Sequence, residues 1–96
     1  MNNETYSLHI IFSPEAWPKA KHMVAKNDRV LLLQDAVVLT QEPLQSTFIE
    51  PNEIHHLYAR GLDVLARNIK SDPHIEVIDD EQWLELTEHA NNVVSW

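Results

Sequence analysis

Short apolar stretches separated by polar segments predict five β-strands. In residues 6–12, apolar side chains occupy every second position, which is the period of a strand. Residues 30–33 differ, because four branched apolar side chains follow one another and then end abruptly at Gln34-Asp35. Such a run is typical of a strand that is covered on both faces within a parallel sheet. The predicted strands are residues 6–12, 29–34, 53–58, 74–78 and 93–96.

The first helical pattern lies between the first two predicted strands. Ser13-Pro14-Glu15 predicts a helix start, with Ser13 as the hydroxyl cap, proline in the first turn and an acid beside it. Residues 36–50, which contain Pro43, predict only a short irregular helix followed by a loop. The apolar face expected for the first helix consists of Trp17, Ala20, Met23 and Val24.

Two further helices are predicted by apolar spacing and by a capping motif. The positions i, i+3, i+4 and i+7 from Leu62 are all apolar, which indicates an amphipathic helix. Asp79 with Gln82 three residues later resembles a capping box. Strands that alternate with helices predict an α/β fold, with a small, mostly parallel sheet of about five strands and helices on both faces. We expect residues 1–96 to form one domain. The predicted helix faces are Leu62, Leu65, Ala66 and Ile69, and then Trp83, Leu86 and Ala90.

The composition excludes several functional classes. The chain has no cysteine, so it can carry no disulfide, thiolate nucleophile or persulfide of its own. Its only glycine is Gly61, which excludes a glycine-rich phosphate loop and a dinucleotide fingerprint. A net charge of −8 argues against direct binding of nucleic acid. No apolar run approaches the ~20 residues of a membrane span, and the N-terminus does not resemble a signal peptide. We therefore expect a cytoplasmic protein that does not bind membranes.

Two polar residues follow predicted strands and could carry chemistry. Ser13 comes directly after the first strand, where a nucleophile could lie, but it lacks the G-x-S-x-G turn and is better interpreted as a helix cap. Asp35 follows Gln34 at the end of the buried strand, where α/β sheets carry their sites. Asp35 could be a general base or a metal ligand, or it could hold the turn, which is the interpretation we favour.

Three other features have a structural interpretation beside a functional one. Asp63 and Arg67 lie four residues apart, which predicts an ion pair on a helix surface. His55 and His56 are adjacent and would point to opposite faces of a strand, so we expect neither a metal site nor a cofactor. The terminal Trp96 is costly to leave exposed, and it should pack into this core or against a neighbouring subunit.

Four motifs in order make nearly the whole chain resemble the TusB/DsrH family. They are Leu8-His9 with Ser13-Pro14, then Asn27-Asp28 with residues 30–35, then Tyr58-Ala59 with Asp63 and Ala66-Arg67, and finally Ile78-Asp79 with Trp83, Leu86-Thr87, His89 and Trp96. The departures fall at Asn27, Ala36 and Asn68, where the family often has glycine. Asparagine tolerates a left-handed backbone, whereas Ala36 is less easily accommodated if the turn after Asp35 needs positive φ.

The resemblance implies a DsrE/F/H-like α/β fold and a role as the small subunit of a TusBCD or DsrEFH sulfur-relay complex. It implies a heterohexamer with TusC- and TusD-like subunits. Such a complex passes persulfide sulfur from a TusA-like to a TusE-like carrier through a cysteine of the TusD-like subunit, for 2-thiolation of the tRNA wobble uridine. A chain without cysteine resembles the TusB branch and is expected to be non-catalytic. The candidate signature or interface residues are Ser13, Gln34, Asp35, Asp63 and Trp96.

Two other functions stay open from the sequence. A small α/β enzyme or ligand-binding domain could use Asp35, and it would require a concave pocket at that edge of the sheet. A self-associating homologue without a relay role would form a stable homo-oligomer in the absence of any partner.

Overall fold

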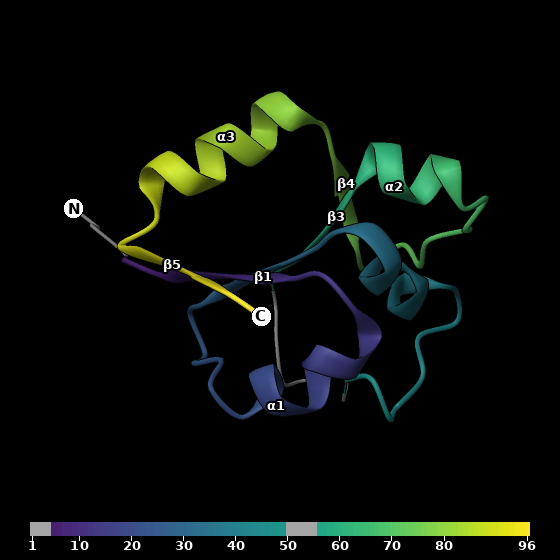
Figure 1. Ribbon diagram of the computed structural model, residues 1–96, viewed down its shortest axis with the longest axis horizontal. Helices are drawn as coiled ribbons and strands as arrows, with labels where there is room; N and C mark the ends of the chain where they lie inside the picture. Colours follow the sequence, from purple (N-terminus) through teal and green to yellow (C-terminus); the bar gives the residue numbers. More distant parts are fainter. Residues whose placement is uncertain (1–4, 50–55) are drawn as a thin grey trace.

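The strands form a single parallel sheet in the computed structural model, which describes residues 5–49 and 56–96. Their order across the sheet is β4-β3-β2-β1-β5, and every neighbouring pair is parallel (Figure 1). This confirms the predicted α/β class and the parallel sheet. The strands are β1 (Ser7–Ile11), β2 (Arg29–Leu32), β3 (Leu57–Arg60), β4 (Glu76–Ile78) and β5 (Asn92–Ser95).

Helices lie on both faces of the sheet, as predicted. The connections from β1 to β4 step across the sheet in one direction, and the connection through α3 returns past β1 to β5. Crossovers of one hand then place α3 on the face opposite α1, as Figure 1 shows. The helices are α1 (Trp17–Lys21), α2 (Gly61–Ala66) and α3 (Asp80–His89), with the 3-10 helices η1 (Pro14–Ala16) and η2 (Gln34–Thr40). The η2 helix confirms the short irregular helix expected in this region.

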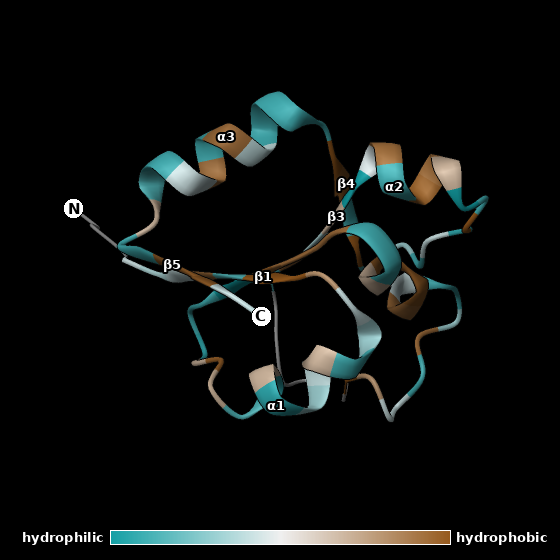
Figure 2. Cartoon of the chain, in the orientation of Figure 1, coloured by the Kyte–Doolittle hydropathy of each residue, from teal (hydrophilic) through white to brown (hydrophobic). Residues whose placement is uncertain are grey.

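Each face of the sheet has its own core, which explains the unbroken apolar run of β2. Val30 and Leu32 belong to the cluster that contains Trp17 of α1, whereas Leu31 belongs to the cluster that contains Leu86 of α3. All three strand residues are fully buried. Because successive side chains of a strand point to opposite faces, a strand covered on both faces needs apolar residues at every position. In Figure 2 the strands at the centre carry much of the hydrophobic colour, while α3 is coloured mostly hydrophilic with hydrophobic positions between.

The first helix differs from the prediction at both ends. Ser13 precedes η1 with an extended backbone, and its side chain makes no capping hydrogen bond. Its carbonyl accepts the Ala16 N–H at 3.2 Å, because Pro14 opens a tight 3-10 turn that uses main-chain groups. Ser13 therefore takes the predicted N-cap position, but the predicted cap by its hydroxyl group was wrong. Met23 lies beyond the end of α1 and is 64% exposed, so it was wrongly placed on the buried face.

The predicted buried face of α2 was also wrong. Leu62 and Leu65 are 59% and 78% exposed, and the helix ends at Ala66. The side chain buried in their place belongs to Asp63, which is 9% exposed. A helix of six residues has little apolar surface with which to fix its own rotation. Its orientation is set instead by the polar contacts of Asp63, described below, together with the packing of Val64 against the core.

Two strand boundaries and the last helix complete the comparison with the predictions. β3 begins at Leu57 and continues past the predicted end to Arg60, whereas residues 53–55 lie outside the described part of the chain. β4 begins at Glu76, later than predicted, because the chain before it is still in a turn. The capping box of α3 is confirmed: the Asp79 carboxylate accepts the Gln82 N–H at 2.8 Å, and the Gln82 side chain accepts the Asp79 N–H at 3.0 Å.

Candidate functional site

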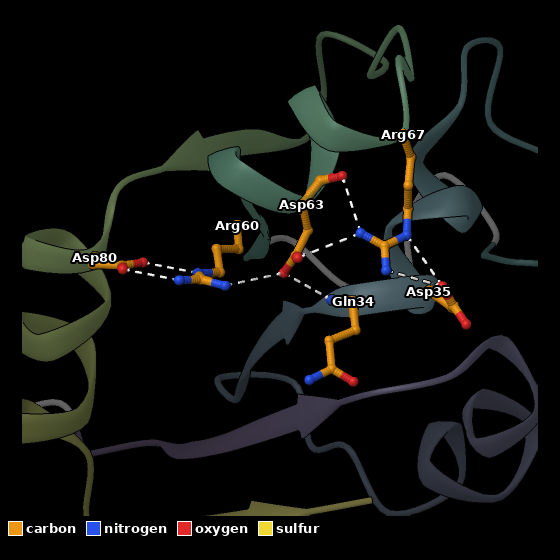
Figure 3. Close-up of polar contacts among 6 residues, drawn as sticks. All are labelled: Gln34, Asp35, Arg60, Asp63, Arg67 and Asp80. Carbon is orange, nitrogen blue, oxygen red and sulfur yellow. Dashed lines mark hydrogen bonds and ion pairs between the residues drawn. The ribbon is translucent and has the colours of Figure 1, made fainter.

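Three connections meet at the carboxyl edge of the sheet, because the strands that lead into them are parallel neighbours. β2 runs into Gln34-Asp35 at the start of η2, β3 ends at Arg60 before α2, and β4 leads into α3. This is the edge at which α/β sheets carry their sites. Figure 3 shows that charged side chains from all three connections and the backbone N–H of Gln34 form one continuous network. We call it the edge network; its residues are Gln34, Asp35, Arg60, Asp63, Arg67 and Asp80.

Asp63 is the centre of the edge network. One carboxylate oxygen accepts the backbone N–H of Gln34 at 2.8 Å and lies 3.6 Å from Nη1 of Arg60. The other oxygen accepts a hydrogen bond from Nη1 of Arg67 at 3.4 Å. The predicted pair of Asp63 with Arg67 is therefore confirmed, but its place on a helix surface was wrong because Asp63 is buried. Two hydrogen bonds and the ion pair with Arg60 commit this carboxylate to holding the turn.

Two outer ion pairs extend the edge network to both sides. Arg67 donates from Nε and Nη2 to one oxygen of Asp35, at 3.1 and 3.0 Å. Arg60 makes a two-pronged contact with Asp80, at 2.8 and 2.9 Å, and its guanidinium lies 5.6 Å from the ring centre of Trp83. The hydrogen bonds from Arg60 hold the pKa of Asp80 below its usual value. The start of η2 and the start of α3 are thereby tied through α2.

Gln34 has the strained backbone of this edge. Its φ is 52°, in the left-handed region that costs a non-glycine residue energy. The hydrogen bond from its N–H to Asp63 fixes this conformation, and its exposed side chain is directed away from the edge network in Figure 3. Positive φ therefore occurs at Gln34 and at Asn68, where φ is also 52°. Ala36 lies within η2 and does not require a positive φ.

The structure brings together three of the five candidate residues from the sequence. Gln34, Asp35 and Asp63 share the edge network, whereas Ser13 and Trp96 are not part of it. Sequence reasoning missed the contribution of Arg60 and Asp80 to this site. The only available signal was an arginine at the end of a predicted strand and an acid at a helix start, which are common in proteins.

Trp96 belongs to a second polar cluster, at the β1–β5 side of the sheet. Its indole N–H points to Nδ1 of His9 at 3.2 Å, and Nε2 of His9 lies 3.0 Å from the Asp28 carboxylate. Indole nitrogen can only donate, so Nδ1 of His9 must be the acceptor and Nε2 carries the proton. Trp96 is half-buried and packs against the core, which supports packing within the chain.

Asp28 orders the loop that precedes β2. Burial acts to raise the pKa of Asp28, but hydrogen bonds from the backbone N–H groups of Ala25 and Ser7 and from His9 outweigh it. The net effect is a pKa below the usual value for aspartate, so Asp28 is ionised in the folded protein at neutral pH. This carboxylate connects the start of β1 to the turn before β2.

The described contacts at the carboxyl edge hold the turns that join strands to helices. Asp35 is paired with Arg67, its side chain is 77% exposed, and it lines neither the 440 Å³ pocket beside α3 nor the 330 Å³ pocket beside Trp17. Among residues 5–49 and 56–96 no group of three or more histidine, cysteine, aspartate or glutamate side chains could hold a metal ion. The geometry therefore favours the turn-holding interpretation of Asp35.

Comparison with known proteins identifies the family of this chain. A family described as DsrH like protein matches residues 12–93 of the 96 residues. The chain belongs to the DsrH-like family. This match confirms the resemblance to the TusB/DsrH family. Members of the DsrH-like family are sulfur-relay proteins of multi-subunit complexes. No curated protein matches this DsrH-like sequence. In the described part of the chain no helix is long and apolar enough to cross a membrane.

Proposed function

We propose that this DsrH-like chain is a non-catalytic subunit of a TusBCD-like sulfur-transfer complex. The observation that carries the proposal is a DsrH-like sequence over residues 12–93 in a chain without any cysteine. Persulfide transfer needs a thiol. A sulfur-relay subunit that lacks one must act through a partner, and the resemblance assigns the sulfur-carrying cysteine to a TusD-like subunit.

In this proposal residues 1–96 act as one domain in a cytoplasmic heterohexamer with TusC- and TusD-like subunits. Sulfur enters from a TusA-like carrier and leaves to a TusE-like one, for 2-thiolation of the tRNA wobble uridine. Neither a cofactor nor direct contact with tRNA is required of this chain. The edge network would give the carboxyl edge a fixed shape, with Gln34, Asp35 and Asp63 as its signature residues and with Ser13 and Trp96 as further contact candidates.

Exposed apolar side chains support assembly with other subunits. Leu62 and Leu65 on α2 and Leu84 on α3 are between 59% and 78% exposed. Each leaves most of its apolar side chain in water, which a subunit interface would relieve. Two separate helices carry these leucines, so more than one neighbour could be accommodated.

Co-expression with TusC- and TusD-like chains tests the proposal. We expect one complex by size-exclusion chromatography with light scattering, and loss of 2-thiouridine from tRNA when this chain is deleted. Leu62→Ser with Leu65→Ser, compared with Leu84→Ser, identifies which helix lies in the complex. A chain that stays monomeric beside both partners and leaves thiolation unchanged when deleted would refute the proposal. A stable homo-oligomer that ignores both partners would favour the self-associating alternative.

A further inference from the structure

A pocket of about 440 Å³ lies between α3 and the sheet, and none of its lining residues belongs to the edge network. Its sheet side is formed near the amino ends of the strands, by Tyr6 before β1, Arg29 at the start of β2 and Glu76 at the start of β4. Its helix side includes Glu85 and His89 in the second half of α3. The volume is in the range that holds small molecules.

Arg29 is the unusual group of this pocket. Its guanidinium carbon lies 4.3 Å from the ring centre of Tyr6, and its Nη1 donates to the hydroxyl of Tyr58 at 3.1 Å. Its Nε is buried and has no hydrogen-bond partner. Within residues 5–49 and 56–96 no carboxylate forms an ion pair with Arg29. A half-buried guanidinium held by two neutral tyrosines is therefore left without the anion that such groups normally pair with.

The donors left over in the pocket match a carboxylate. The Tyr58 oxygen already accepts from Arg29, which leaves the hydroxyl proton of Tyr58 free to donate to another acceptor. Because Nε of Arg29 is buried, Nη1 and Nη2 of its planar guanidinium are the donors left for the two oxygens of a carboxylate. Both tyrosine side chains are 8% exposed, so this donor set is fixed by packing before any ligand arrives.

Two acids limit which carboxylates fit. Glu76 and Glu85 line the same pocket, and their negative charge opposes a simple anion. Glu76 is the register partner of Tyr58 on β4, so Tyr58 separates it from Arg29 on β2. Strands two apart in a sheet are roughly 10 Å apart, which separates Glu76 on β4 from Arg29 on β2 within the pocket. Ile78 and Leu86 supply an apolar wall.

We propose that this pocket binds a small zwitterionic ligand, with its carboxylate on Arg29 and Tyr58 and its protonated amine facing Glu76 and Glu85. The apolar wall contacts the methylene groups that separate the two charges. This site is independent of the proposed sulfur-relay role, because none of its lining residues belongs to the edge network and its contacts need no partner subunit.

Titration of the full-length chain with ω-amino acids of increasing length tests the proposal. The probes are glycine, β-alanine, 4-aminobutyrate and 6-aminohexanoate, with acetate and butylamine as single-charge controls at matched ionic strength. Nuclear magnetic resonance observes the Nε–H of Arg29. We expect saturable shifts with at least one amino acid, and binding about 10- to 100-fold weaker for both controls, as expected for loss of a charge-assisted contact.

Three variants separate the parts of the site. Arg29→Met should abolish binding, whereas Lys70→Met, which removes the same charge from a residue outside the pocket, should not. Glu76→Gln with Glu85→Gln should let acetate compete with the amino acids. The proposal is overturned if no probe gives saturable shifts, if the controls bind as well as the amino acids, or if Arg29→Met binds like the original chain. If Arg29→Met does not fold, Arg29→Lys and the variant with Glu76→Gln and Glu85→Gln are used to test the proposal in its place.

Discussion

Replacement of Asp63 by asparagine tests whether the edge network holds the carboxyl edge together. The amide keeps the shape of the side chain and one oxygen for the Gln34 N–H, but it removes the charge. A hydrogen bond to a charged group contributes about 1.5–3 kcal/mol and a neutral one about 0.5–1.5, so this contact loses about 1 kcal/mol. The pairing with Arg67, at 3.4 Å and one-third exposed, contributes about 0.2–1 kcal/mol more. We therefore expect a loss of about 1–2 kcal/mol in the free energy of unfolding.

Urea unfolding followed by tryptophan fluorescence measures this loss, and thermal unfolding should show a melting temperature about 4–16 °C lower. Asp35→Asn is the matched control, because it removes an equal charge from a carboxylate that is 77% exposed. It should change the free energy of unfolding far less than Asp63→Asn. If the two variants lose the same amount, or if Asp63→Asn loses less than about 0.5 kcal/mol, burial does not make Asp63 the centre of the edge network.

Three further predictions concern other parts of the fold. Gln34→Gly should raise the free energy of unfolding by about 0.5–1 kcal/mol in the same urea assay, because φ is 52°, while Gln34→Val should lower it. The pKa of Asp28 is lowered in the folded state, so its contribution is complete above the unfolded pKa of about 3.9 and is lost as the pH falls further. The free energy of unfolding should therefore change less between about pH 6 and 3 in Asp28→Asn than in the original chain. Trp96→Phe should cost about 1 kcal/mol through the lost donor to His9, and an unchanged urea midpoint would contradict that contact.

The class of fold was predictable because it depends on local patterns that the sequence displays directly. Apolar runs of the right length predicted the strands, and Val30–Leu33 predicted a sheet covered on both faces. The capping box at Asp79 and Gln82 was equally local, since both of its hydrogen bonds lie within one helical turn. The motifs around these elements also led to the correct family.

Only the tertiary structure decided which side chains meet. Asp63 touches Gln34 across 29 positions of sequence, and Arg60 reaches Asp80 across 20, through strands whose order no local pattern reveals. The exposure of Leu62 has the same cause: in so short a helix the polar contacts of one buried acid outweigh the apolar spacing. Sequence by itself thus determined the elements and the family, because short-range spacing encodes them. The packing of the strands determined the edge network, because hydrogen bonds and ion pairs depend on distances that exist only in the folded chain.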